Sequence, residues 1–134
     1  RGFMTTPKNL NEAKGEIAQK IRGMKNKSRE VFAIEVNGEY AGYVELHDLN
    51  QIHHEHKAII GYCLHPKFRG RGITTKAVKL VTDYAFKKYK LKRISGWCRT
   101  FNKASARVLE KSGYKLEGIL RITGIVLFID GNQK

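Results

Sequence analysis

The stretch that decides the fold is residues 64–74, which read Leu-His-Pro-Lys-Phe-Arg-Gly-Arg-Gly-Ile-Thr. An apolar run ends at Leu64, and a segment with helical periodicity begins at Ile73. The first backbone amides of a helix lack partners inside the helix, and the helix dipole adds positive charge there. Gly70 and Gly72 allow the backbone to approach an anion closely, and the neighbouring arginines add full charge. This strand–turn–helix pattern predicts a pyrophosphate-binding loop.

A second motif runs over residues 99–114 and reads Arg-Thr-Phe-Asn-Lys-Ala-Ser-Ala-Arg-Val-Leu-Glu-Lys-Ser-Gly-Tyr. Asn102 suits the N-cap of a helix, with Ser105 three residues further on. Gly113 is a natural helix stop. The motif therefore predicts a helix over residues 102–112.

Together the two motifs resemble those of the GCN5-related N-acetyltransferases, the GNAT family. Residues 69–74 resemble its Arg/Gln-x-x-Gly-x-Gly/Ala loop, although Thr74 stands where Gly or Ala is usual. Residues 102–114 resemble the Asn-x-x-Ser…Glu-Lys-x-Gly-Phe/Tyr signature of the ribosomal-protein-alanine acetyltransferase (RimJ/RimL-like) branch. The resemblance covers residues 58–120. It implies an α/β (α+β) fold in which helices flank a mixed central sheet with splayed strands, and a single N-acetyltransferase domain over residues 1–134.

The resemblance also implies acetyl-CoA as co-substrate, with its pantetheine arm in the gap between strands at residues 58–64 and 93–98. The residues that it assigns to acetyl-CoA are Tyr62, Cys63, Leu64, Arg69, Gly70, Arg71, Gly72, Ile73, Thr74, Thr75, Asn102 and Ser105. Lys103, Arg107 and Lys111 have two open interpretations, as contacts of the CoA 3′-phosphate or as an exposed helical face.

The rest of the chain offers weaker periodic patterns. Apolar residues at steps of three and four predict an amphipathic helix over residues 10–24. Asn37-Gly38 predicts a hairpin between strands at residues 31–36 and 40–46. A central strand is predicted at residues 58–64, a helix at 73–89 and a second strand at 93–98, which runs parallel to the central strand. Strand-like runs follow at 114–116 and 119–129.

Both ends depart from the family pattern. Relatives begin with a strand and a helix before the segment that resembles residues 10–24, whereas nine residues precede it here. Truncation at the N-terminus and divergence of the sequence are both open interpretations. Because both ends differ from the family pattern, the resemblance predicts less about substrate specificity than about the fold or the cofactor.

The resemblance implies that the amine attacks the thioester directly in a ternary complex, with a general base and polarising donors but no acyl-enzyme. Three familiar acid or base positions are occupied by Leu109, Trp97 and Ile59, which cannot transfer protons in these roles. Glu45 is the candidate catalytic residue because its strand is expected to border the cleft. The alternatives are that Glu45 faces outward and that a water relays the proton. Tyr114 is interpreted as a core aromatic beside the cofactor.

Cysteines and histidines suggest little chemistry of their own. Cys63 and Cys98 make no disulfide framework, lie in apolar runs and are predicted to be reduced core thiols. His47, His53, His54, Glu55 and His56 cluster in sequence but fit no closed zinc pattern. We therefore expect a solvated His-rich loop and no metal.

The composition limits the class of protein. Among 134 residues, the net charge of +14 implies attraction to polyanions, which include CoA, a ribosome or another nucleic acid. A lysine-rich surface kept for solubility is the alternative. With no apolar run of about 18 residues and no signal-peptide pattern, we expect a cytoplasmic protein without membrane contact.

Three functions remain open. The first is an N-acetyltransferase for a primary amine, where the basic surface favours a protein N-terminal α-amine, for example of a ribosomal protein, over polyamines, aminoglycosides or other small amines. The second is an acyl-CoA-binding module with weak or lost catalysis, which Leu109 favours. The third is a nucleic-acid-binding protein, although the usual aromatic-plus-basic RNA signatures are missing. A homodimer is expected because relatives are often dimers.

Overall fold

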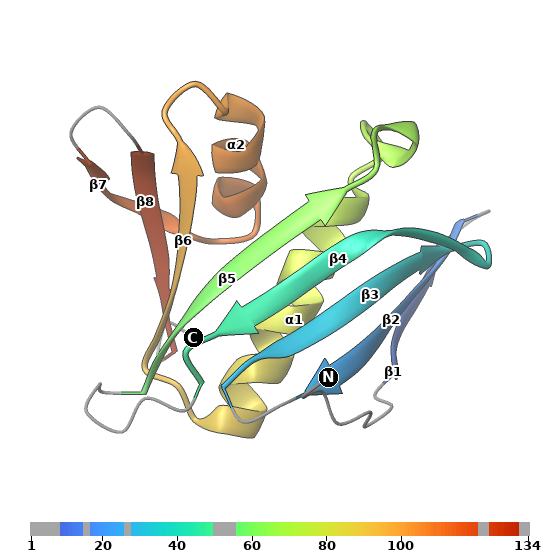
Figure 1. The fold of residues 1–134 in the computed structure, drawn as a ribbon, viewed down its shortest axis with the longest axis horizontal. Helices are drawn as coiled ribbons and strands as arrows, with labels where there is room; N and C mark the ends of the chain where they lie inside the picture. The colour runs from blue at the N-terminus through green and yellow to red at the C-terminus, as the bar shows by residue number, and fades with distance from the viewer. Residues whose placement is uncertain (1–8, 15–16, 26–27, 50–55, 121–123, 132–134) are drawn as a thin grey trace.

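The computed structural model describes residues 9–14, 17–25, 28–49, 56–120 and 124–131. In this part of the chain, eight strands form one mixed sheet in the order β1-β2-β3-β4-β5-β6-β8-β7 (Figure 1). The strands are β1 (Asn9–Lys14), β2 (Ile17–Lys25), β3 (Glu30–Val36), β4 (Glu39–His47), β5 (Lys57–Leu64), β6 (Arg93–Arg99), β7 (Lys115–Leu120) and β8 (Gly124–Asp130). The helices are the 3₁₀ turn η1 (Pro66–Phe68), α1 (Ile73–Tyr89) and α2 (Lys103–Lys111). The architecture confirms the predicted mixed sheet with flanking helices.

The prediction of a helix over residues 10–24 is wrong, because the chain forms the antiparallel strands β1 and β2 there. Gly15 and Gly23 lie within this segment, and glycine disfavours a helix interior by about 1 kcal/mol relative to Ala. β2 also pairs with β3 from Gln19↔Val36 to Lys25↔Glu30, so the edge of the existing sheet supplies hydrogen bonds to its backbone. Sheet pairing therefore outweighs a weak helical pattern in this segment.

The hairpin between β3 and β4 confirms the Asn37-Gly38 prediction. Both residues have left-handed backbone conformations, with φ of 51° and 85°, and Val36 pairs with Glu39. A two-residue turn with positive φ at both positions matches the right-handed twist of the strands that it joins.

The strands β5 and β6 create the main feature of the fold. They are connected through α1 and run parallel, as predicted, and they pair from Lys57↔Arg93 to Ile60↔Gly96. Beyond Gly96, β6 pairs only with β8, while β5 continues beside β4, so the two strands diverge (Figure 1). The divergence opens a gap toward the C-terminal ends of both strands.

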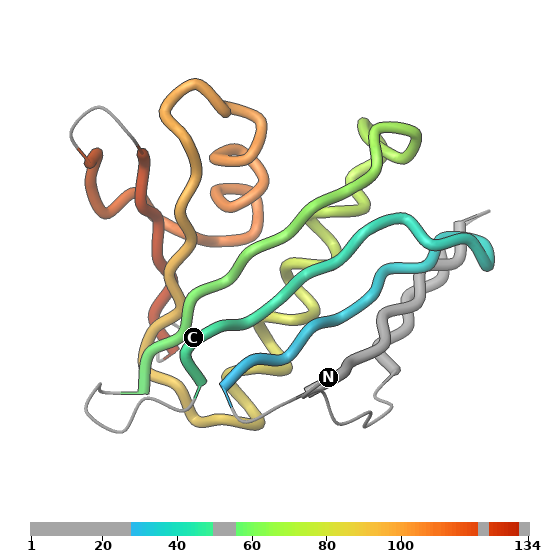
Figure 2. The backbone as a smooth tube through the Cα atoms, in the orientation of Figure 1, coloured from blue at the N-terminus to red at the C-terminus, as the bar shows by residue number. Residues whose placement is uncertain are grey.

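One face of the sheet carries the hydrophobic core and both α-helices. The buried face of α1 includes Ile73, Ala77, Val78 and Val81, whereas Leu80 and Tyr84 are half-buried. Thr82 Oγ1 and Tyr114 OH lie 2.8 Å apart, which connects α1 to the segment that follows α2. The path of the backbone tube shows α1 passing behind β3, β4 and β5 (Figure 2).

The C-terminal strands form a hairpin whose boundary differs from the prediction. The second strand begins at Gly124 rather than at Ile119, and β7 extends to Leu120 with an irregular register between Leu116 and Gly118. Neither α-helix of the described residues is long and apolar enough to cross a membrane.

Candidate functional site

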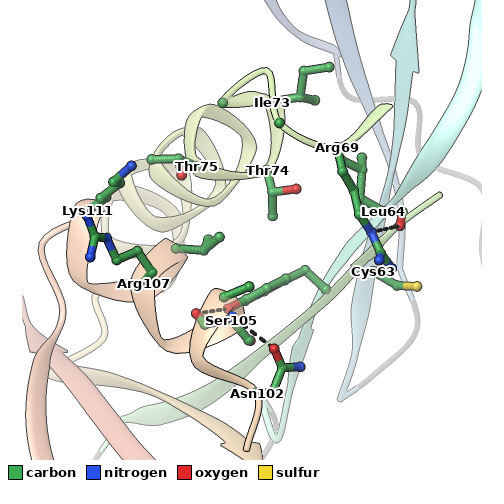
Figure 3. A pocket seen from close by; sticks show the side chains of 15 residues that line it. Cys63, Leu64, Arg69, Ile73, Thr74, Thr75, Asn102, Ser105, Arg107 and Lys111 are labelled. Atoms are coloured by element: carbon green, nitrogen blue, oxygen red, sulfur yellow. Dashed lines mark hydrogen bonds between the residues drawn. The ribbon is translucent and has the colours of Figure 1, made fainter. Parts of the chain in front are cut away.

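A cavity of about 580 Å³ lies between the end of β5, the start of α1 and the helix α2 (Figure 3). Its walls are formed by the loop after β5, the first turn of α1 and one face of α2. The lining residues are Tyr62, Cys63, Leu64, Arg69, Gly70, Gly72, Ile73, Thr74, Thr75, Asn102, Ala104, Ser105, Arg107, Val108 and Lys111. The structure thus brings together every residue that the sequence assigned to acetyl-CoA except Arg71.

The first turn of α1 faces this cavity through a glycine-dependent turn. Gly70 and Gly72 have φ of 82° and 74°, a conformation that residues with a Cβ rarely adopt. Gly72 is the N-cap of α1, and no side chain of the described residues caps this end of the helix. The first bond inside the helix runs from Lys76 N–H to Gly72 O, at 3.1 Å. The backbone N–H groups that precede Lys76 therefore point out of the N-terminal end of α1.

The loop between β5 and α1 is held to the sheet at several points. His65 N–H donates to Ala41 O at 2.8 Å, and His65 Nδ1 accepts from Lys67 N–H at 3.1 Å. Arg69 Nε donates to Leu64 O at 3.3 Å, so the arginine folds back over the end of β5 (Figure 3). These contacts place the glycine turn at a defined position relative to the gap between the strands.

The cavity wall is positively charged. Arg69, Arg107 and Lys111 line it, and no carboxylate belongs to the lining among the described residues. Arg107 and Lys111 project from α2 on the same side of the cavity (Figure 3). Lys103 does not line the cavity, and the Arg71 guanidinium lies 5.9 Å from the centre of the Phe68 ring. The wall is therefore suited to an anionic ligand.

A tyrosine connects β5 to α2 across the gap. Tyr62 OH donates to Ser105 O at 2.8 Å and lies 2.8 Å from Ser105 Oγ, while Ser105 N–H donates to Asn102 Oδ1 at 3.1 Å. Burial raises the pKa of Tyr62 to about 12, against the opposing effect of the hydrogen bond with Ser105. The hydroxyl is therefore protonated at neutral pH and available as a donor.

The two cysteines differ from the prediction that both are core thiols. Cys98 is buried, and burial raises its pKa. Cys63 is exposed and lines the cavity. Cys63 lies on the same face of β5 as the exposed Ile59 and opposite to the buried Ile60 and Leu64, because side chains alternate along a strand.

Two apolar residues of the lining, Ala104 and Val108, were missed in the sequence. A signal was available, because Ala104, Arg107, Val108 and Lys111 have the spacing of one helical face. Leu109 points elsewhere and is buried against β6, where a Cβ on Gly96 would lie 2.8 Å from Leu109 Cδ1.

The other candidate residues lie away from the cavity lining. Glu45 is on the sheet face opposite to α2, where Glu45 Oε2 is 3.1 Å from His47 Nε2 and Glu45 Oε1 is 3.8 Å from Arg29 Nε. Tyr114 is buried with its hydroxyl bonded to Thr82, and burial raises its pKa, which agrees with a core aromatic. His53, His54 and Glu55 lie outside the described residues.

The sequence of this chain matches the family model described as "Acetyltransferase (GNAT) domain" over residues 1–115. Among curated proteins, it is 52% identical to the "Probable N-acetyltransferase YjcK" of Bacillus subtilis over 48% of this chain and 35% of the relative. It is 32% identical to the spermidine N(1)-acetyltransferase of Escherichia coli over 71% of this chain and 50% of the relative. It is 35% identical to the "Putative ribosomal N-acetyltransferase YdaF" of Bacillus subtilis over 63% of this chain and 45% of the relative. The chain thus spans half or less of the length of these relatives.

A solved structure supports the same relationship at the level of the fold. Mycobacterium smegmatis RimJ, solved in complex with CoA-disulfide, superposes with a TM-score of 0.71 at 27% identity, over 77% of this chain and 53% of that chain.

Proposed function

Because this chain belongs to the GNAT acetyltransferase family, we propose that it transfers an acetyl group from acetyl-CoA to a primary amine by direct attack in a ternary complex. The observation that carries the proposal is the cavity where the Gly70–Gly72 turn, the start of α1 and the basic face of α2 meet. Members of the GNAT family use acetyl-CoA as co-substrate. The positive lining without a carboxylate among the described residues fits the charge of that ligand.

Each part of the cavity has a role in this proposal. The glycine turn and the N-terminal amides of α1 hold the pyrophosphate, with Arg69 beside them. Arg107 and Lys111 hold the 3′-phosphate. The backbone of β5 at Tyr62, Cys63 and Leu64 binds the pantetheine arm, because β6 no longer pairs with β5 there. Acetyl-CoA supplies the activated acyl group, and the protein supplies orientation in the gap.

The acceptor that we propose is a protein N-terminal α-amine. The relationship to YdaF, whose name describes a ribosomal N-acetyltransferase, supports this class. The net charge of +14 also disfavours the approach of polycationic amines. The spermidine N(1)-acetyltransferase of Escherichia coli, which matches more of the chain, supports the alternative of a small polyamine.

The first experiment is a calorimetric titration of the chain with acetyl-CoA, beside the variant Gly72→Glu. A carboxylate at the N-cap of α1 opposes the pyrophosphate, so we expect binding to weaken at least about a hundredfold, since one unfavourable charge contact in a desolvated site exceeds ~3 kcal/mol. Gly38→Glu is the matched control, because Gly38 also has a positive φ of 85° and open space around it but lies in the β3–β4 turn. Equal binding by Gly72→Glu and Gly38→Glu would contradict the assignment of the cavity.

The acceptor is tested by thiol release from acetyl-CoA in the presence of two probes, a peptide with the N-terminus of a ribosomal protein and spermidine. Preferential acetylation of the peptide, with the label at its α-amine by mass spectrometry, is the expected result. Preference for spermidine would replace the protein acceptor with a polyamine and leave the acetyl-CoA site unaffected.

A further inference from the structure

The sheet face opposite to the cavity carries an acid–base pair at the point where β5 and β6 separate. Gly61 is the first residue of β5 beyond the last β5–β6 pair, Ile60↔Gly96. Its neighbour Tyr62 points to α2, so the next position along the strand faces the opposite side of the sheet. With no side chain at Gly61, this face has room beside the gap for side chains from the neighbouring strand β4.

Glu45 and His47 occupy that space. A Cβ built on Gly61 would lie 3.8 Å from Glu45 Oε2 and 3.9 Å from His47 Nε2, and these two atoms are 3.1 Å apart. Both side chains are partly exposed, at 20% for Glu45 and 30% for His47. The pair is therefore accessible to solvent. It lies on the face of the sheet opposite to the cavity-lining side chain of Tyr62.

The surroundings of the pair are mostly apolar. In the neighbouring strands, Val31 and Gly61 lie beside Glu45, and Ile59 lies beside His47. Among the described residues, Arg29 makes an ion pair with Glu45, with its Nε 3.8 Å from Glu45 Oε1. The Arg29 side chain is 44% exposed. Arg29, Glu45 and His47 thus form a short chain of ionisable side chains between apolar neighbours, and His47 is the member that can act as a base near neutral pH.

The same face offers an approach for a second substrate. Both described α-helices pack on the opposite face, and the exposed Ile59 and Trp97 flank the point of divergence. The Trp97 indole lies across β8, because a Cβ on Gly124 would meet Trp97 Nε1 at 2.0 Å. An acceptor that crosses this face reaches the gap from the side opposite to α2.

We propose that His47 is the general base for the acceptor amine and that Glu45 positions its imidazole, an assignment that rests on the function proposed above. Nε2 of His47 lies 3.1 Å from Oε2 of Glu45, so the carboxylate is placed to stabilise the imidazolium that forms when the Nδ1 lone pair of His47 accepts the proton. A base whose side chain is oriented by a neighbouring carboxylate is an arrangement that supports general-base catalysis.

The proton and electron balance is complete without a further reactant. The acceptor ammonium gives one proton to His47, and the nitrogen lone pair then attacks the thioester carbonyl carbon. The C–N bond forms, the C–S bond breaks, and the electron pair leaves on the CoA sulfur. A second proton passes from the nitrogen to the thiolate, and His47 releases its proton to water.

The test compares His47→Gln and Glu45→Gln with Glu35→Gln, a control that changes a carboxylate on β3 away from the pair. Acetyl-CoA affinity is measured by calorimetry, and kcat is measured at saturating acceptor with the peptide and with spermidine. We expect His47→Gln to lower kcat about a hundredfold or more and Glu45→Gln to lower it about tenfold, since orienting groups contribute less. Acetyl-CoA affinity and the kcat of Glu35→Gln remain at the wild-type level.

Chemical rescue separates a base from a structural residue. Added imidazole should restore part of the kcat of His47→Ala, because it replaces the proton acceptor and not the fold. Wild-type kcat in His47→Gln, or lost activity in His47→Ala without rescue, would overturn the assignment. A wild-type chain that binds acetyl-CoA but acetylates neither probe would contradict the proposed transferase function as well. A chain that fails to bind acetyl-CoA would contradict the cavity assignment instead.

Discussion

Tyr62 connects two walls of the cavity, the end of β5 and the start of α2. Its hydroxyl crosses from β5 to Ser105 on α2, at the position where the β5–β6 ladder no longer connects these parts of the sheet. A hydrogen bond of this kind contributes about 1 kcal/mol to stability. The phenol therefore maintains the width of the gap as well as the position of α2.

The raised pKa of Tyr62 predicts a loss of stability in alkali. The pKa of Tyr62 is about 12 in the folded chain, against 10.0 for an unburied tyrosine. The folded state therefore favours the neutral phenol. This contribution is fully present below pH 10 and is lost as the pH rises through about 12, because the unfolded chain releases the proton first. We expect the loss to be about 2 kcal/mol, measured by urea denaturation across this range.

Tyr62→Phe is the variant that tests this assignment. It should be less stable than the wild type at neutral pH by about 1 kcal/mol and should lose less stability between pH 10 and 12. Tyr89 and Tyr114, whose pKa values are also raised by burial, remain in the variant and account for the residual slope. An identical pH dependence in the two proteins would refute the role of the Tyr62 hydroxyl.

At the scale of elements, the approach of α2 to the sheet depends on Gly96. Gly96 is the last residue of β6 that pairs with β5. It has no side chain, and Leu109 of α2 fills the space above it. α2 in turn carries Asn102 at its N-cap and Arg107 and Lys111 on the cavity face. The position of the basic wall is therefore linked to a small residue in the middle of the sheet.

Gly96→Ala is expected to destabilise the chain by about 1–3 kcal/mol, because the added Cβ lies 2.8 Å from Leu109 Cδ1 and forces α2 or its side chain to move. Acetyl-CoA binding should weaken in parallel. Gly118→Ala is the control, since no atom lies within 4 Å of its Cβ position. Its unfolding free energy should change by less than about 0.5 kcal/mol. Equal stability of the two variants by urea denaturation would show that the contact with Leu109 is relieved without displacement of α2.

At the scale of the whole molecule, the net charge of +14 makes ligand binding sensitive to ionic strength. Arg69, Arg107 and Lys111 concentrate part of this charge at the cavity, so they attract an anionic ligand most strongly at low salt. Screening at high salt should weaken that attraction, since the Debye length falls from about 10 Å at 0.1 M to about 3 Å at 1 M.

We expect Arg107→Gln to weaken acetyl-CoA binding about fivefold at low salt, because one charge contact near the surface contributes roughly 1 kcal/mol, and to reduce the salt dependence of the dissociation constant. Lys87→Gln removes an exposed charge from the far end of α1 and should change neither quantity. Calorimetric titrations at several salt concentrations make the comparison. A parallel salt dependence in Arg107→Gln and the wild type would place the 3′-phosphate elsewhere.

Local patterns in the sequence predicted the parts of the molecule that depend on short-range geometry. The helix over residues 73–89, the Asn37-Gly38 turn and the Asn102 cap each follow from a few adjacent residues, because backbone conformation and capping are decided within one turn. The glycine–arginine loop belongs to this class, since the outward-pointing amides at the start of α1 need only a strand end, a flexible turn and a helix start.

Tertiary pairing decided the rest. Residues 10–24 became strands because β3 offered an edge for pairing, which no local periodicity reveals. Cys63 is exposed because it lies on the face of β5 opposite to both described α-helices, and packing between elements decides which face is covered. Glu45 and His47 meet over Gly61 only through the β4–β5 register, in which a shift by one residue would turn both side chains to the core face. The amino-acid sequence thus determined which residues could bind an anion or move a proton, and the sheet register determined which of them lie together, because contacts between strands join residues that are distant along the chain.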